Sequence, residues 1–518
     1  MNRIVVPLAL LLFLPLFGLA APFLFPGSGQ LTAGTLSHLW SFVLGGYIAS
    51  TLALILGVGV GVFILGVGNA WIIASYDFPG KKIFEWALIL PLAVPTYVMA
   101  YLFVDLLQFS GPIQSTLRAL LGMDSLWFFP DPRSLSGAIW SFSFCLFPYV
   151  YLITRTAFLE RSGRLIEVSE TLGYSPLQGF VKLVLPMARP AIFAGMALAL
   201  MEVLADFGAV SYFGVQTFAT GIFKAWLSFG DRVAAVQLAL GLLSFVLLIF
   251  FIEQSSRSKL RYASSTRGKP LAKSLQGKKA FFAFAFCGIT LLCGFLLPAF
   301  ALLQLLIQQG LTIDIRYLDW LSNSLAVSII TALISVALAV FFAYSVRMNS
   351  RLSWVNRLLG FGYALPGAVL AIGILSFLEI FQLAWWMSAS ILVLVYAYLV
   401  RFLSSSLQSV EAGLARITPS MDASAALLGL SKVQILKRVH VPLLKRSLIT
   451  AGLFVFVDVM KELPATLLLR PFNFDTLAVA TYQLAADERL AELALPSLTI
   501  VLVGLFPVLL LSRVISKS

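Results

Sequence analysis

Two pairs of carboxylates lie within long apolar stretches of the sequence. Glu202 and Asp206 are four residues apart, and Asp458 and Glu462 repeat this spacing 256 residues later. Residues four apart share one face of a helix, so each pair presents its two carboxylates together. Ionisable groups inside a membrane span usually face a bundle interior or an aqueous path. The pairs therefore suit a cationic or metal substrate on a translocation path, or they brace helices by pairing with Lys461 or with each other.

The sequence offers little other chemistry. The three cysteines have no metal-ligand spacing and the chain has only two histidines, which counts against a zinc site or a histidine proton relay. Three Gly-Lys pairs occur, but each lacks the upstream glycine and the following Ser or Thr of a phosphate-binding loop. We therefore predict no catalytic residue, no cofactor or metal held by this chain, and no ATP hydrolysis by it.

The composition is that of an integral membrane protein. Of the 518 residues, 60% are hydrophobic and 11% are charged, whereas a soluble domain has about 45–50% apolar and about 25% charged residues. The first apolar run begins after Arg3 and continues to Phe25. Because a span needs about 20 residues, we expect an uncleaved first helix here rather than a signal peptide.

Apolar runs long enough to span a membrane number about twelve, six in each half of the chain, which predicts an all-α polytopic membrane protein. They lie near 4–25, 43–75, 86–108, 136–155, 190–213, 233–252, 280–307, 322–346, 358–381, 385–402, 446–469 and 493–512.

A basic connector joins the two halves. The formal net charge is +13, and residues 254–279 contain eight basic residues and no acidic one. Such a segment can bind nucleic acid, but flanking spans make a cytoplasmic loop that follows the positive-inside rule the better interpretation. Alternating the spans from this loop places both termini in the cytoplasm, and we predict no nucleic-acid partner.

The two halves are related in sequence. An offset of 256 pairs Gly173 with Gly429 and Pro186 with Pro442, whereas before these segments an offset near 271–273 pairs Pro95 with Pro366. The first half thus has about fifteen extra residues, placed most simply in the loop 109–135. Six helices per half predict parallel repeats, related by an axis along the membrane normal. The predicted domains are a first repeat at 1–255, a linker at 256–279 and a second repeat at 280–518.

A polar, helix-breaking segment interrupts each repeat on the predicted cytoplasmic side. In the first copy, within 161–190, Gly173 suits a left-handed helix end. Ser175 and Pro176 then suit the N-cap and first residue of a short second helix, which Pro186 is expected to stop.

The second copy, within 411–446, has the same signals. Thr418-Pro419 starts a helix, Gly429 breaks it, Ser431 restarts it and Pro442 is expected to stop it. A single amphipathic segment of this kind would be expected to lie on lipid. Two copies at equivalent places instead indicate a docking surface for a partner that is itself dimeric.

The first copy also matches a known motif. Glu167-Val168-Ser169, Gly173, Leu183, Leu185 and Pro186 have the spacing of E-A-A-x3-G-x9-I-x-L-P, and the segment resembles the EAA motif of binding-protein-dependent ABC importer permeases. The second copy departs from it, since Ala423 replaces the glutamate beside Asp422, and Val439 and Val441 replace the Ile and Leu.

The resemblance implies a role for both segments. In that family the motif forms a coupling helix that docks on an ATP-binding subunit, so two copies of that subunit are expected, with ATP and Mg²⁺ bound there. The residues expected to couple to the ATPase are Glu167, Ser169, Glu170, Gly173, Ser175, Pro176, Leu185, Pro186, Asp422, Ala423, Gly429, Ser431, Val441 and Pro442.

Three further segments, 76–101, 204–226 and 459–492, resemble the fused permeases of ferric-iron ABC importers. That resemblance implies a type I importer permease fold in a bacterial inner membrane. It also implies ATP-driven movement of ferric iron, delivered by an extracytoplasmic solute-binding protein, into the cytoplasm by alternating access. Thiamine, a polyamine or a phosphonate is the alternative solute within the same class. A twelve-helix secondary transporter is the alternative class.

Overall fold

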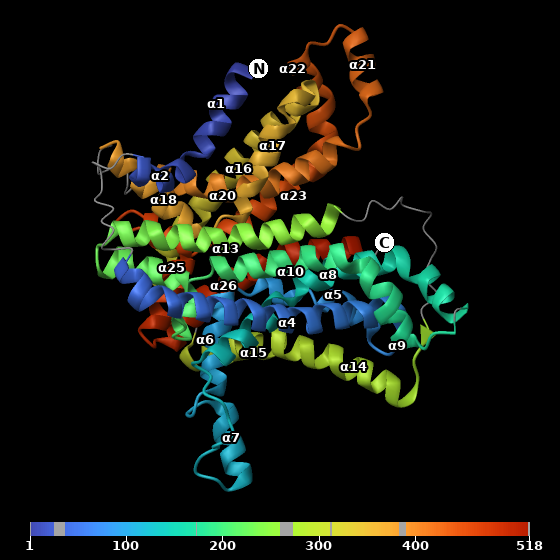
Figure 1. The fold of residues 1–518 in the computed structure, drawn as a ribbon, viewed down its shortest axis with the longest axis vertical. Helices are drawn as coiled ribbons and strands as arrows, with labels where there is room; N and C mark the ends of the chain where they lie inside the picture. Colours follow the sequence, from blue (N-terminus) through green and yellow to red (C-terminus); the bar gives the residue numbers. More distant parts are fainter. Residues whose placement is uncertain are drawn as a thin grey trace. The chain divides into compact units, whose positions relative to one another are not determined.

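The computed structural model describes residues 2–24, 37–171, 173–258, 273–310, 313–382 and 390–515. Helices make up nearly all of this described part (Figure 1). Its strands are the two-residue β1 (Tyr76–Asp77) and β2 (Lys273–Ser274), which pair in parallel with Tyr76 opposite Lys273. The predicted all-α membrane fold is confirmed.

The chain forms two compact units. Unit 2 contains Trp40–Gly221, Ser244–Leu311 and Leu484–Ser518. Its elements are η1 (Trp40–Leu44), α4 (Gly45–Ser75), α5 (Lys81–Ala87), η2 (Leu90–Ala93), α6 (Thr96–Leu107), α7 (Pro112–Leu121), α8 (Leu135–Thr171), α9 (Pro176–Gly179), η3 (Phe180–Val184), α10 (Leu185–Ala205), α11 (Gly208–Tyr212), most of α12 (Phe218–Phe223), the second part of α13 (Arg232–Ser258), α14 (Gly277–Leu291), η5 (Leu292–Leu296), α15 (Leu297–Gln309) and α26 (Leu490–Ile515).

Unit 1 contains Met1–Leu39, Ile222–Leu243 and Thr312–Gln483. Its elements are α1 (Asn2–Leu12), α2 (Leu14–Leu24), η4 (Lys224–Ser228), the first part of α13, α16 (Ile315–Met348), η6 (Ser350–Leu352), α17 (Ser353–Leu359), η7 (Gly360–Ala364), α18 (Gly367–Ile380), α20 (Ile391–Leu414), α21 (Pro419–Leu427), α22 (Lys432–Ile435), η8 (Leu436–His440), α23 (Val441–Met460), α24 (Pro464–Leu469) and most of α25 (Leu477–Ala486).

The compact units exchange helices between the predicted repeats. The first helices of the second repeat, α14 and α15, belong to unit 2, where α15 packs on α26 and α6. The first helices of the chain, α1 and α2, belong to unit 1, where α2 packs on α18. The repeats at 1–255 and 280–518 therefore remain a division of the sequence, and neither repeat coincides with a compact unit.

Eight helices of the described part are long and apolar enough to cross a membrane, or ten when each of two bent helix pairs counts as one span. The sequence predicts about twelve. The run 4–25 is divided between α1 and α2, which have 11 residues each and are too short to span alone. The run 446–469 is interrupted because α23 ends at Met460.

The two bent pairs correct a prediction. Runs 86–108 and 358–381 were each expected to form one span, but the helix bends by 97° after Ala93 and by 110° after Ala364. Pro95 and Pro366 lie at the bends. Proline has no N–H to donate and forces the preceding residue out of the helical region, which explains both breaks.

A glycine seam holds α4 against α8 in unit 2. Gly57, Gly61 and Gly66 face Ile139, Ser143 and Val150, so the two helices run parallel. A Cβ atom at Gly66 would lie 2.5 Å from Val150 Cβ, which only a glycine avoids. Small residues of this kind allow close approach of helices in a membrane, where lipid gives no hydrophobic drive for association.

One polar contact recurs at the offsets of the sequence repeat. In unit 2, Arg155 of α8 pairs with Glu85 of α5. In unit 1, Asn356 Nδ2 of α17 donates to Glu411 Oε1 of α20 at 2.6 Å. Glu85 and Asn356 are 271 residues apart, and Arg155 and Glu411 are 256 apart. Equivalent helices are thus joined in both repeats, α5 with α8 by an ion pair and α17 with α20 by an amide–carboxylate hydrogen bond.

Candidate coupling loops and intramembrane carboxylates

The second polar segment has the predicted start, break and restart. Thr418 is the extended residue before α21, and Pro419 is its first residue. Gly429 has φ +79°, the left-handed conformation that favours glycine. Ser431 N donates to Gln434 Oε1 at 2.8 Å and Gln434 N donates to Ser431 Oγ at 3.4 Å, a reciprocal capping box that starts α22.

The first polar segment repeats this geometry. After α8 ends at Thr171, Gly173 has φ +72°. Ser175 N donates to Gln178 Oε1 at 3.1 Å, and Gln178 N donates to Ser175 Oγ at 3.3 Å, before the short helix α9. The side chains of Glu167, Ser169, Glu170 and Pro176 lie outside the described residues.

The predicted helix stops at Pro186 and Pro442 are wrong. Leu185 N donates to Phe180 O and Val441 N donates to Leu436 O, each five residues earlier, so a π-turn leads directly into α10 and α23. Each proline then lies in the first turn of the next helix, where an N–H is not needed. Because the widened turn does not require the N–H group that proline lacks, the helix continues through each proline.

A charged cluster anchors the second segment within unit 1. Arg347 Nε, at the end of α16, lies 2.8 Å from Asp422 Oδ2, and His440 Nε2 donates to Asp422 Oδ1 at 2.5 Å. Arg347 also donates to the carbonyl oxygens of Leu414 and Ile417, each at 2.9 Å. The Asp422 carboxylate is therefore directed into the unit.

This cluster holds Asp422 ionised. Burial by itself raises the pKa of the Asp422 carboxyl, but the hydrogen bonds from Arg347 and His440 outweigh burial and lower that pKa below its usual value. The contribution of the ionised Asp422 carboxylate to the stability of the folded state is therefore complete above about pH 4. It is lost as the pH falls through the lowered pKa. The sequence pointed to Asp422 but not to Arg347 or His440, although His440 is one of only two histidines and directly precedes the Val441-Pro442 pair.

Apolar side chains are exposed next to both breaks. In the second segment Leu427 and Leu428, which directly precede Gly429, are 89% and 82% exposed. In the first segment Leu177 and Val181, which follow Gly173, are also exposed. Exposed apolar side chains that are grouped in this way are typical of surfaces that contact another protein or a membrane.

Asp206 joins two helix breaks in unit 2. Its carboxylate accepts a hydrogen bond from Thr96 Oγ1, the residue after Pro95, and its Oδ1 accepts another from Ala209 N at 2.8 Å. Asp206 is buried and caps the short helix α11 just after α10 ends. It therefore braces the bend of the α5–α6 pair against the end of α10.

Glu462 occupies the equivalent position in unit 1. Its Oε1 accepts from Ala465 N at 2.9 Å and its Oε2 from Thr466 N at 3.0 Å, which caps α24. Arg401 Nη1 of α20 donates to Glu462 Oε1 at 3.0 Å. The side chain of Glu462 is 1% exposed and that of Arg401 is 10% exposed, so this is a buried ion pair.

The two braces differ because of one residue. Thr96 follows Pro95 and reaches Asp206, whereas Gly367 follows Pro366. A Cβ atom at Gly367 would lie 2.7 Å from Glu462 Oε1 and 2.9 Å from Arg401 Nη1. The absence of a side chain at Gly367 thus leaves the space through which Arg401 reaches Glu462.

The other two predicted path residues are more accessible. Asp458 Oδ1 lies 3.1 Å from Lys461 Nζ, one of the pairings expected of a brace, and both side chains are partly exposed. Glu202 is also partly exposed. That these four carboxylates line a translocation path stays a prediction. Among the described residues, no group of three or more His, Cys, Asp or Glu side chains is arranged to hold a metal ion.

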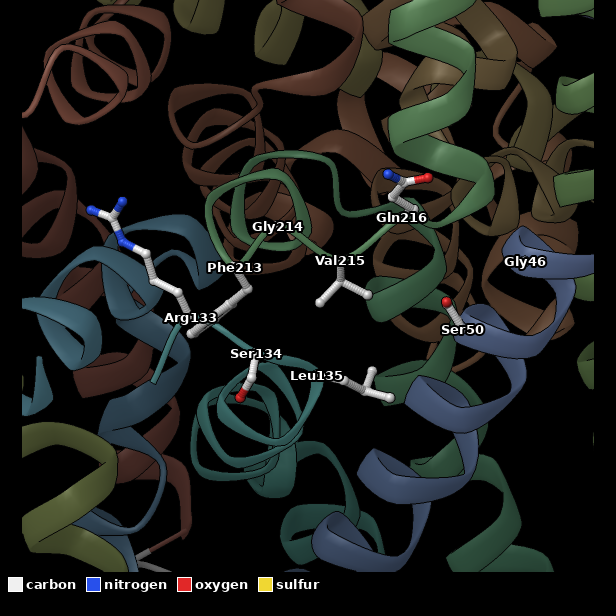
Figure 2. Close-up of a pocket in the computed structure, with 9 residues that line it drawn as sticks. All are labelled: Gly46, Ser50, Arg133, Ser134, Leu135, Phe213, Gly214, Val215 and Gln216. Carbon is white, nitrogen blue, oxygen red and sulfur yellow. The ribbon is translucent and has the colours of Figure 1, made fainter. Parts of the chain in front are cut away.

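A cavity of about 360 Å³ lies beside the start of α8 in unit 2, and sequence analysis missed it. The turn 213–216, residues 133–135 and two residues of α4, Gly46 and Ser50, line it. Figure 2 shows Val215 and Leu135 at this cavity with the Arg133 guanidinium turned away from them. Arg133 Nη2 instead lies 3.2 Å from Glu488 Oε1.

Comparison with known proteins identifies the family. Residues 63–262, which include the first polar segment, match the family model of the binding-protein-dependent transport system inner membrane component. The Fe(3+)-transport system permease protein FbpB 2 of Haemophilus influenzae is 30% identical over 478 residues, 90% of this chain and 89% of that protein. The chain belongs to the binding-protein-dependent ABC importer permeases.

Other permeases match shorter stretches. The sulfate transport system permease protein CysT of Salmonella typhimurium is 31% identical over 153 residues, 29% of this chain and 52% of that protein. The molybdenum transport system permease protein ModB of Escherichia coli is 29% identical over 174 residues, 34% of this chain and 71% of that protein. This permease is therefore a multi-helix transport subunit of an inner membrane, and the resemblance seen in its EAA-like segment is confirmed.

Proposed function

We propose that this permease moves ferric iron into the cytoplasm, driven by ATP hydrolysis on two separate ATP-binding subunits. The substrate assignment rests on how much of the chain each relative matches. The relative named for Fe(3+) transport matches 90% of the chain, whereas the sulfate and molybdenum relatives match about a third of it or less. An extracytoplasmic solute-binding protein delivers the ion.

The two EAA-like segments are the docking points of the ATP-binding subunits. Their exposed leucines and valine beside Gly173 and Gly429 form the contact surface, together with Ala423 and the residues of the first motif. Asp422 positions the second segment from within, through Arg347 and His440. The remaining coupling candidates named above act in the same two docking points.

Transport proceeds by alternating access. ATP-driven closure of the ATPase pair draws the two segments together and opens the path outward, and hydrolysis resets the inward-open state. A partner can drive such a change only by binding the two states with different affinities. The partly exposed Glu202 and Asp458 suit contact with a passing cation, whereas Asp206 and Glu462 brace the broken helices at the path.

Orientation follows from charge. Both termini, the linker 256–279 and both coupling segments face the cytoplasm of a bacterium, because basic residues gather in these loops. The loops after α6 and α10 then face the binding protein.

Reconstitution with the cognate ATPase tests the substrate. We expect Fe(III)-loaded binding protein to stimulate ATP hydrolysis in proteoliposomes, and the iron-free binding protein to stimulate it much less. Binding proteins loaded with thiamine, a polyamine, a phosphonate, sulfate or molybdate serve as matched controls. Stimulation by one of these, with none by the iron form, would reject ferric iron and keep the importer class.

A further inference from the structure

Residues 109–130, called the excursion below, form a projecting segment of unit 2 between α6 and α8. It contains α7 and lies where the first repeat is longer than the second. In Figure 1, α7 projects away from α4 and α14 and runs across their direction. Among the contacts of α7 in the described part, the main one is with α6, directly before it in sequence.

The excursion is held in shape by its own polar groups. Arg118 Nη2 donates to Phe109 O at 2.9 Å, and its guanidinium stacks 3.7 Å from the centre of the Phe109 ring. Gln114 Nε2, which is buried, donates to Leu107 O at 2.7 Å. These bonds fasten α7 to the end of α6.

The rest of the excursion is apolar on one side, which is partly buried at Ile113 and Leu117 and exposed from Leu120 onward. Ile113, Leu117, Leu120 and Leu121 follow helical spacing along one face of α7, and Ser115 lies on the opposite face. Leu120 is 77% exposed, and Trp127, which follows the helix, is 84% exposed. Only Arg118 and Asp124 carry charge within residues 109–130, so the surface has no net charge with which to attract a charged protein partner.

Exposed aromatic residues also occur at the same end of unit 2. Because α4 and α8 run parallel, the start of α4, the start of α8 and the end of α6 that leads to it lie at one end. Exposed aromatic side chains occur at each: Trp40 and Phe42 before α4, Phe109 after α6 and Trp140 in α8. Exposed aromatic residues at the ends of membrane-spanning helices mark the membrane–water interface. Trp127 and Phe128 of the excursion are exposed aromatic residues as well.

We propose that residues 109–130 lie in the lipid interface on the extracytoplasmic side, with the apolar face of α7, Trp127 and Phe128 among the headgroups. An amphipathic helix in this position buries its apolar face about 5–10 Å into the headgroup–acyl boundary. The excursion anchors the outer end of the bent α5–α6 pair, whose bend is braced by Asp206. The partner is a neutral lipid surface, and the inference holds for any transported solute.

Site-directed spin labelling tests this placement in the full chain. Cys145, Cys287 and Cys293 are replaced by alanine, and single labels are attached through Leu120→Cys, Trp127→Cys and the matched control Ser115→Cys. In phosphatidylcholine proteoliposomes we expect labels at 120 and 127 to show a severalfold higher ratio of O₂ to nickel-complex collision than the label at 115. Labels at all three positions that are equally accessible to the nickel complex would overturn the proposal.

Two additions keep the result decisive. Met123→Cys replaces Leu120→Cys if that variant does not fold, as judged by a monodisperse elution profile. Adding solute-binding protein distinguishes the other occupant: labels at 120 and 127 that are water-accessible alone and become immobilised by the binding protein would show a protein-docking surface and overturn the lipid placement. Failure of ferric iron as substrate would leave these collision ratios unchanged.

Discussion

Arg401→Ala is expected to lower the free energy of unfolding by about 3–5 kcal/mol, because it leaves the Glu462 carboxylate buried without its cation. Glu462 is 1% exposed, and its remaining partners are the backbone N–H groups of α24 and the Thr466 hydroxyl. Thermal or denaturant unfolding of the purified protein in detergent measures the loss.

Two control variants separate the buried charge from a general effect of truncation. Arg316→Ala removes the cation of an exposed pair with Asp314 in the same unit, and such pairs contribute about 0–1 kcal/mol. The double variant Arg401→Met with Glu462→Gln removes both charges and is expected to recover most of the loss. Equal destabilisation by Arg401→Ala and Arg316→Ala would contradict the role assigned to the buried pair.

Arg347→Ala is expected to reduce transport-coupled ATPase stimulation at least tenfold while the protein still folds. Arg347 ties Asp422 and two carbonyl oxygens of the chain before α21 to the end of α16. Hydrogen bonds to charged groups contribute roughly 1.5–3 kcal/mol, and each 1.4 kcal/mol is about tenfold in an equilibrium. The docking-competent position of the second segment is therefore populated less.

ATPase stimulation by loaded binding protein in proteoliposomes checks this expectation. Arg351→Ala is the matched control, since Arg351 is exposed and lies four residues further along the chain. Arg347→Lys keeps the charge but loses the fork of donors, and we expect an intermediate loss. Full stimulation with Arg347→Ala would show that the cluster does not position the coupling segment.

Local signals in the sequence predicted the backbone geometry of the two polar segments well. Gly173 and Gly429 take the left-handed conformation, and Ser175 and Ser431 cap the helices that follow. These features depend on the chemistry of one to four neighbouring residues, so a sequence pattern is sufficient to predict them.

Proline effects were predicted less well, because a proline constrains the chain without choosing its path. At Pro95 and Pro366 the helix bends by about a right angle, whereas at Pro186 and Pro442 a π-turn precedes the proline and the helix continues. All four remove one N–H donor. The packing around each site decides between a bend, a stop and a widened turn.

Partnerships across long sequence distances could not be predicted. Arg401 and Glu462 are 61 residues apart, and Arg347 and Asp422 are 75 apart. Neither pair has a local pattern, and the space that admits Arg401 depends on Gly367, which reads in sequence as an ordinary small residue. The exchange of α14–α15 and α1–α2 between units was likewise absent from the hydropathy pattern, since apolar helices carry little information on which bundle they join.

Uptake of radioactive iron into proteoliposomes tests the central claim most directly. Vesicles contain the permease with its ATP-binding subunits, and Fe(III)-loaded binding protein is added outside. The account predicts iron accumulation that requires ATP on the side of the coupling segments and the binding protein on the other side, with no dependence on a proton gradient. Iron uptake that proceeds without ATP and follows an imposed proton gradient would contradict it.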